Sequence, residues 1–475
     1  MVGLQDYEQL DGFGLGTYQQ VAELNKALAA GYDIPATSGG VSGSALRVES
    51  LEASLKVITY QMQHIKFWQK IPKLPAYSTV EEYNRLVTYG GEGGVFTPEG
   101  ELGEYDDATY SRQVALVKYL QTVRKVTHPL TLVRAAHGDI VGNEVRNGIM
   151  WLLGKIEFYL YWGNRSLRYN FPTNEGHQFD GINALIDPAN VIDALGDPLS
   201  EDIIESAANI VVENYGIPTD IFIGTKPLAD LAKIMFPKER IVVPFKEGQI
   251  GVPLNTFASQ AGTLAFNPDV FLRKRYVIPG TTAATSSKAP LTPTLTSATH
   301  GTNAGGAWNK TNNGWGTYRY ACTAANRYGE SAPSASTAGD APISADTDKY
   351  AVVCTSNAGA DPYPADWYNV YRTVAGGSAT DPHYLVYQFA ASNQGAGQAQ
   401  TTFTDLNSII ANSHKVFIGE LTPQVISFKQ LAPMMKMDLA VIEPSIRWLQ
   451  LLYGTPVIYA PKKWVIIKNV GEPTI

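Results

Sequence analysis

The residues that could carry acid–base or metal chemistry are widely spaced along this 475-residue chain. No two histidines have the His-x-His or His-x3-His spacing that places two metal ligands on one face; they lie at positions 64, 128, 137, 177, 300, 383 and 414. The sequence also has no GxxxxGK[ST], HExxH, CxxC, GxSxG or EF-hand pattern. We therefore predict no catalytic, cofactor-binding or metal-binding residues and interpret the histidines as capping or surface groups.

Two glycine-rich segments near the N-terminus resemble parts of known motifs without their context. Residues 12–16 (GFGLG) follow no predicted strand, and no acidic residue comes after them at the spacing of a dinucleotide site. Residues 39–44 (GGVSGS) differ by one residue from a nucleophile elbow. We interpret both segments as parts of a flexible N-terminal arm.

The most unusual segment runs from residue 64 to residue 128 and has a tip rich in glycine and carboxylates. The tip holds six glycines between positions 90 and 103, together with six acidic residues: Glu92, Glu99, Glu101, Glu104, Asp106 and Asp107. Their spacing matches no calcium-binding loop. We therefore interpret the tip as a solvated charge cluster that docks on basic residues of a neighbour.

The two arms of this segment carry the groups that such docking would use. Lys66, Lys70 and Lys73 lie on the first arm and could meet carboxylates across a subunit boundary, where each surface pair contributes only about 0–1 kcal/mol. Val114, Leu116 and Val123 on the second arm leave apolar surface uncovered. Because an isolated two-stranded ribbon is marginal in water, this hairpin requires another subunit, and we predict these residues and the tip carboxylates as subunit contacts.

The elements that must hold this hairpin are helices and strands of a mixed fold. Apolar residues at 145, 149, 152, 156 and 160 predict a helix of roughly 25 residues within 137–164, with Asp139 at its start. A second helix is predicted over 200–215 with Ser200 as its N-cap, followed by a strand at 221–224, a helix over 228–235 closed by Pro237, and a strand at 241–244. The runs IRWLQLLYG, PVIYA and KKWVIIKNV predict C-terminal strands.

Composition restricts the class of protein. With 44% apolar and 11% aromatic residues the chain is globular, and its length implies about three domains. No run of about 18 apolar residues predicts a membrane span, and the N-terminus lacks the pattern of a secretory signal, so a reducing cytosol and free thiols at Cys322 and Cys354 are expected. A formal charge of −7 argues against a dedicated nucleic-acid binder with a basic face.

Residues 281–412 differ in composition from the rest of the chain. They carry 14 charged residues in 132, against 67 in the other 343, and are rich in Gly, Ala, Ser and Thr. Short β-prone runs at 317–324, 350–356, 367–373, 384–390 and 401–406 alternate with turn residues. This pattern predicts an inserted all-β sandwich, which follows a Pro-containing polar linker.

The order of these elements resembles the major capsid protein of tailed bacteriophages with the Hong Kong 97-type fold, an α+β fold. The resemblance implies an N-terminal arm and short helix (1–65), an extended hairpin loop (66–126), a peripheral domain with the spine helix (127–199), an axial domain (200–280), and strands that return to both domains (413–475). It covers about 340 residues, everything except the insert, and rests on architecture.

The insert resembles an immunoglobulin-like or fibronectin type III domain. Residues 318–334 (YRYACTAANRYGESAPS) are similar to that family's late-strand pattern, and residues 368–372 (YNVYR) are similar to its earlier central strand. The two occur here in reversed order along the chain. The resemblance therefore implies a two-sheet sandwich without strict fibronectin topology.

By this resemblance the chain is a structural shell subunit and not an enzyme. It would assemble with itself into the hexamers and pentamers of an icosahedral head that encloses double-stranded DNA without sequence-specific binding. The insert would face outward, the partners would be scaffold, portal and decoration proteins, no cofactor or membrane would be involved, and assembly in the host cytoplasm would end in the virion. Two alternatives are an encapsulin-type nanocompartment shell and a carbohydrate-active enzyme with an accessory β-sandwich.

Overall fold

The computed structural model describes residues 57–91, 96–103, 106–133, 138–167, 178–239, 254–310, 314–355, 361–391 and 400–473. The chain divides into two compact units, and every element given below lies in the larger one, which comprises Val57–Val133 and Asp139–Ile475. Of the expected N-terminal arm and short helix (1–65), residues 1–56 lie outside the described residues, as does the expected strand at 241–244.

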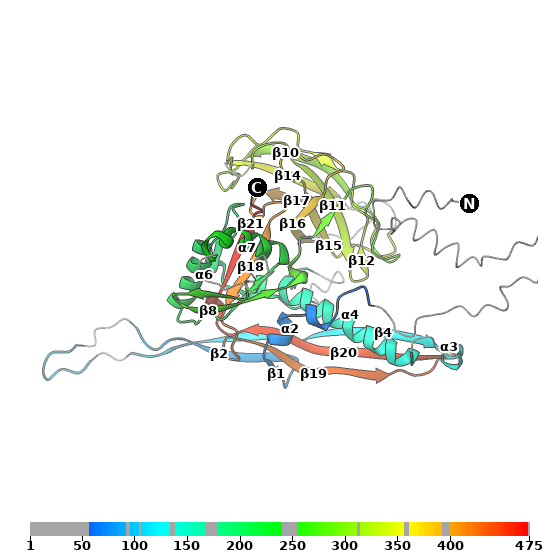
Figure 1. Cartoon of the computed structure of the whole chain (residues 1–475), viewed down its shortest axis with the longest axis horizontal. Helices are drawn as coiled ribbons and strands as arrows, with labels where there is room; N and C mark the ends of the chain where they lie inside the picture. Colours follow the sequence, from blue (N-terminus) through cyan, green and yellow to red (C-terminus); the bar gives the residue numbers. More distant parts are fainter. Residues whose placement is uncertain are drawn as a thin grey trace, which may run out of the picture. The chain divides into compact units, whose positions relative to one another are not determined.

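A long four-stranded sheet carries the longest helix on one face (Figure 1). Its strand order is β1-β19-β20-β4, with bounds β1 Lys73–Pro75, β19 Ile426–Asp438, β20 Ser445–Ile458 and β4 Lys118–Thr127. The sheet is antiparallel except for the parallel pairing of its edge strand β1 with β19. Three short elements adjoin these strands in the chain: η4 Met62–His64 and α2 Phe67–Lys70 precede β1, and α3 His128–Leu132 follows β4. Leu120 of β4 faces the helix and packs against the same core, so one face of this sheet is buried.

Helix α4 spans Ile140–Trp162, close to the prediction, and begins where the sequence indicates. The Asp139 carboxylate accepts the backbone N–H groups of Val141 and Gly142, which satisfies two of the donors left free at a helix start. Leu152, Ile156 and Leu160 are buried in the main core, as the periodicity predicts.

A six-stranded mixed sheet holds a second core. Its order is β5-β21-β18-β6-β8-β7, with bounds β5 Val191–Asp193, β21 Trp464–Val470, β18 His414–Gly419, β6 Asp220–Ile223, β8 Gly262–Pro268 and β7 Thr256–Ser259. Around it lie α5 Ile182–Leu185, η5 Pro188–Asn190, α6 Glu201–Glu213, α7 Thr225–Glu239, η6 Val270–Leu272 and η7 Pro461–Lys463. Ser200 caps α6 as predicted, and the apolar face of α6 packs on β18, β21 and β6 through Ile204 and Val211.

Residues 294–405, together with one short strand that precedes them, form two further sheets with their own core. One has the order β10-β14-β17 (β10 Thr294–Thr302, β14 Asp348–Thr355, β17 Gln400–Asp405). The other has the order β12-β11-β15-β16-β9, with β13 also pairing with β11 (β9 Tyr276–Val277, β11 Arg319–Asn326, β12 Gly329–Glu330, β13 Thr337–Ala338, β15 Trp367–Arg372, β16 His383–Ala390). Side chains from both sheets, including the free thiols of Cys322 and Cys354, meet in one apolar cluster.

The remaining strands form a two-stranded hairpin that extends away from the other elements of this unit (Figure 1). Strand β2 (Val80–Thr88) pairs antiparallel with β3 (Thr109–Leu116). The hairpin is therefore shorter than the expected loop over 66–126, because β1 and β4 are taken into the four-stranded sheet.

Three local expectations are wrong. The Gly-Thr-Pro at 454–456 does not break the C-terminal strand: Pro456 lies within β20 opposite Phe428. Pro237 does not close α7, which continues to Glu239. Strands β10 and β19 were not expected; β19 holds Pro433 within the second of two register shifts, so its alternation is disrupted and its signal in the sequence is weak.

Among the described residues no helix is long and apolar enough to cross a membrane.

Candidate functional site

The base of the hairpin is fixed to the four-stranded sheet by side chains on one face of β2. Glu81 accepts a hydrogen bond from Lys429 of β19 at 3.1 Å. Arg85 donates to the Ile458 carbonyl at 2.7 Å, and the Tyr83 ring contacts Tyr459 edge-on at 5.1 Å. These contacts attach the hairpin to the sheet, because an isolated two-stranded hairpin is only marginally stable in water.

The opposite face of the hairpin is uncovered and carries apolar side chains on both sides of an Arg112–Glu82 ion pair. Cross-strand pairs place Val80 opposite Leu116, Glu82 opposite Val114, and Leu86 opposite Tyr110. Val114 is 51% exposed and Leu116 is half-buried. We call this surface the hairpin outer face; its apolar residues are Val80, Leu86, Tyr110, Val114 and Leu116. No element among the described residues covers it. Burying such a surface lowers the free energy of the chain in water.

The tip of the hairpin combines charge with exposed apolar groups. Of the predicted tip carboxylates, Glu99, Glu101, Asp106 and Asp107 are exposed, while Glu92 and Glu104 lie outside the described residues. Asp106 turns back to accept the Gly91 backbone N–H at 2.5 Å. Phe96 and Leu102 are 98% and 96% exposed, so the tip presents apolar side chains beside its carboxylates.

The ammonium groups of Lys70 and Lys73 already have partners within the chain, whereas Lys66 is fixed through its backbone N–H. Lys70 donates to Asp220 at 2.6 Å. Lys73 donates to the Trp68 carbonyl at 2.7 Å and lies over the Trp68 ring. The backbone N–H of Lys66 donates to Glu157. The structure thus places these lysines beside α2 and β1, away from the hairpin strands, and does not bring them together with the tip carboxylates.

A second uncovered surface lies on the four-stranded sheet, on the face that does not carry α4. Along β4, Val126 and Leu120 point toward the helix, whereas Tyr119 and Val123 point away and are each 57% exposed. Beyond the end of β19, Leu439, Val441 and Ile442 are also exposed. The sequence singled out Val123 but missed the loop that joins β19 to β20, although the apolar run at 439–442 is itself a signal.

A buried polar group fixes the sheet and its helix to the chain that enters the hairpin. Glu157 of α4 is fully buried and accepts backbone N–H groups from Lys66, Phe67 and Trp68 at 2.6–2.8 Å. Burial and the neighbouring Asp269 raise the pKa of Glu157 to about 9. Asp269 in turn accepts the Tyr161 hydroxyl at 2.9 Å. Sequence reasoning missed Glu157 because a single acid in an apolar helix carries no pattern.

The described residues contain no group of three or more His, Cys, Asp or Glu side chains that could hold a metal ion. The hairpin and the four-stranded sheet instead present exposed apolar and charged surfaces on paired strands. Such surfaces suit binding between protein chains.

Comparison with known proteins relates the chain to phage capsid proteins. Residues 97–286 match the family model of the SU10 major capsid protein. The major capsid proteins of Staphylococcus phage S25-3 and Staphylococcus phage K are each 27% identical over 455 residues, covering 94% of both chains. A protein of Enterococcus phage phiEF24C is 28% identical over 457 residues, again with 94% of both chains covered.

Among solved structures, the capsid of a native GTA particle aligns with 92% of this chain and 99% of its own, at 7% identity and a TM-score of 0.46. A chain from Mycobacterium phage Adephagia aligns with 93% of this chain and 99% of its own, at 8% identity and a TM-score of 0.43.

Proposed function

We infer that this chain is a phage major capsid protein, the structural subunit from which a virion shell is built. The observation that carries this inference is the end-to-end match to phage major capsid proteins, over 94% of this chain and 94% of each relative. The match to the SU10 major capsid protein model over residues 97–286 agrees with it.

We propose that the chain has the Hong Kong 97-type fold. Support comes from the order of its own elements: an extended hairpin, then a 23-residue helix across a long sheet, then an α/β module, with the last strands returning to both sheets. In this assignment α4 is the spine helix, the four-stranded sheet belongs to the peripheral domain and the six-stranded sheet to the axial domain.

We propose that the hairpin outer face and the tip are completed by other copies of the chain, in hexamers and pentamers of an icosahedral head that encloses double-stranded DNA. Burial of apolar surface supplies the driving force at roughly 25 cal/mol per Å². The exposed tip carboxylates would select the register by pairing with cations of a neighbour, since rim charges act more on specificity than on affinity.

The residues from β10 to β17 are proposed to form an outward-facing immunoglobulin-like domain. Two antiparallel sheets around a shared core support this assignment. We further propose scaffold, portal and decoration proteins as partners and assembly in the host cytoplasm; these follow from the role of a shell subunit.

Negative-stain electron microscopy of the purified full-length chain tests self-assembly. We expect capsomers or closed shells when the chain is concentrated, with assembly weakening as apolar burial is opposed by low concentrations of urea. A chain that sediments as a monomer at every concentration and ionic strength, with or without co-expressed scaffold, would contradict the proposal.

A further inference from the structure

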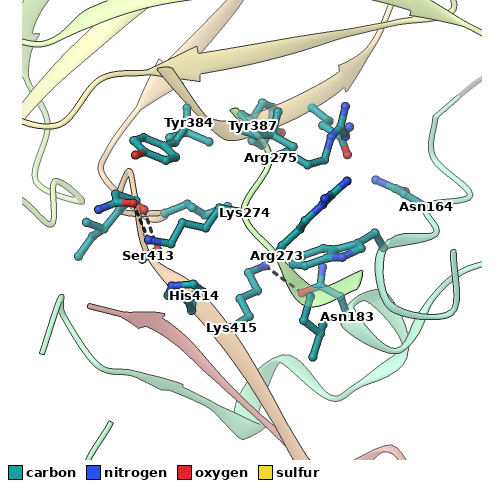
Figure 2. A pocket seen from close by; sticks show the side chains of 18 of the residues that line it. Asn164, Asn183, Arg273, Lys274, Arg275, Tyr384, Tyr387, Ser413, His414 and Lys415 are labelled. Carbon is teal, nitrogen blue, oxygen red and sulfur yellow. Dashed lines mark hydrogen bonds between the residues drawn. The ribbon is translucent and has the colours of Figure 1, made fainter. Parts of the chain in front are cut away.

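A cavity of about 280 Å³ lies between the C-terminal end of α4, the segment from η6 to β9, strand β16 and the start of β18 (Figure 2). Its lining contains four cationic side chains, Arg273, Lys274, Arg275 and Lys415, and no aspartate or glutamate. Figure 2 shows these side chains gathered around one space, although they come from different segments of the chain.

Two of the four cations are already neutralised by carboxylates outside the lining. Lys274 donates to Glu472 at 2.7 Å, and Arg275 donates to Glu330 at 2.9 Å. Among the described residues, Arg273 and Lys415 have no carboxylate within ion-pair distance. Lys415 instead donates to the Asn183 side-chain oxygen at 2.9 Å and lies over the Trp162 ring. The cavity is therefore lined by two cations without a carboxylate partner in the described part of the chain: Lys415 is half-buried, and Arg273 is exposed to solvent at the cavity's edge.

His414 supplies a second, independent observation. Its side chain lines the same cavity and is only 6% exposed, and neither ring nitrogen has a hydrogen-bond partner in the described part of the chain, although Nε2 lies 4.0 Å from the Glu472 carboxylate. Buried polar atoms are normally paired, and an unpaired one costs about 1–3 kcal/mol. A buried imidazole without a hydrogen bond, beside cations that have no carboxylate partner in the described part of the chain, suits this space to a polar ligand.

We propose that this cavity binds a small anion with phosphate or carboxylate oxygens, held by Arg273 and Lys415. Guanidinium groups bind such oxygens in a bidentate manner, and the ammonium acts as a point charge beside them. The aromatic rings of Phe158 and Trp162 in the same lining leave room for an apolar body on the anion. The proposal does not depend on assembly of the chain.

The electrostatics of Lys415 favour an anionic partner. Burial and the nearby Lys468 lower the pKa of Lys415 to about 8. A bound anion would favour the charged ammonium and raise this pKa again. Lys415 therefore reports occupancy, because its neutral amine is the form that reacts with acylating reagents.

Isothermal titration calorimetry of the purified full-length chain with inorganic phosphate and, separately, with citrate tests the proposal. Sodium chloride at matched ionic strength serves as the baseline for screening. We expect saturable binding of at least one anion. Arg273→Gln and Lys415→Met should each weaken it about tenfold or more. The matched control Lys288→Gln, an exposed cation far from the cavity lining, should leave it unchanged.

Chemical modification of Lys415 gives a second test that does not require a measurable heat of binding. The anion should slow acylation of Lys415, measured by mass spectrometry near pH 8, without slowing that of Lys288, and Arg273→Gln should remove this protection. Protection by phosphate alone or by citrate alone assigns the anion chemistry. Lack of saturable binding of both anions, or equal effects of all three variants, would overturn the proposal.

Discussion

At the residue scale, single polar side chains inside apolar cores hold elements at fixed positions. Glu157 fixes the start of α2 by accepting three backbone N–H groups. In the insert, Arg372 is 1% exposed and donates to Asp405 and Asn407, both at 2.6 Å, between the rings of Trp308 and Tyr318. Each group is fully enclosed, so its hydrogen bonds act in a medium that strengthens them and penalises their loss.

Glu157 makes the free energy of unfolding depend on pH. Its pKa of about 9 in the folded chain lies above the ordinary value of 4.5, so the folded state holds a proton that the unfolded state releases. The stability contributed by this proton is fully present below pH 4.5 and is lost as pH rises toward 9.

We expect Glu157→Gln to flatten that dependence. The amide cannot ionise, but its nitrogen cannot accept the Trp68 N–H, so unfolding at pH 5 should become about 1–3 kcal/mol easier. Between pH 5 and 9 the variant should lose less stability than the parent chain. Urea denaturation at several pH values measures both effects, with the exposed Glu213→Gln as control. An identical pH slope in Glu157→Gln and the parent chain would rule out this role.

At the element scale, the hairpin and the four-stranded sheet each have one anchored face and one free face. On β2, residues 81, 83 and 85 contact the sheet, and the alternate residues point outward with Val114. Because side chains alternate along a strand, a single register determines which set is free. The hairpin outer face is therefore a property of the pairing, and its residues can be changed without disturbing the anchor.

We expect Val114→Asp to impair self-assembly while leaving the fold intact. The side chain is exposed, so the free energy of unfolding should change by only about 0.5 kcal/mol. A carboxylate buried at a subunit contact would instead oppose association strongly. Sedimentation velocity gives the assembled fraction. Val374→Asp, an equally apolar exposed valine in the insert, is the matched control. Normal assembly of Val114→Asp would show that this face is not a contact.

At the scale of the whole molecule, the three largest apolar clusters of the described residues lie between the four-stranded and six-stranded sheets, beside the six-stranded sheet, and inside the insert. The core of the insert is separate from the other two, and the chain enters and leaves the insert close together: Lys274 reaches the Asn412 side chain at 2.5 Å. One strand crosses the boundary of the insert: β9 precedes residue 281 in the chain but pairs with β16 of the insert.

We therefore expect a chain in which a short Gly/Ser linker replaces residues 283–408 to fold and to assemble. It should be less stable than the parent, because the Arg275–Glu330 contact and the β9–β16 pairing are lost. Circular dichroism, thermal unfolding and electron microscopy check the outcome. Insoluble protein from this deletion, together with an isolated fragment 270–412 that stays unfolded, would show that the insert is part of the main core.

Patterns local in the sequence determined much of the fold. The periodicity of α4, the caps at Asp139 and Ser200, and the β-prone runs of the insert required only neighbouring residues, and the structure confirms each of them. The same local patterns located the acidic tip and the exposed Val114, whose role as a subunit contact remains a prediction.

Only the tertiary structure decided which strands join which sheet and which polar groups meet. β1 and β4 are not part of the hairpin, because β1 pairs with β19 and β4 pairs with β20, strands that come more than 300 residues later in the chain. Glu157 meets the backbone at 66–68, and Arg273 and Lys415 line one cavity, across shorter gaps in sequence than those that separate the strands. Hydrogen bonds and charges act over a few ångströms of space, so no local pattern of residues records these long-range encounters.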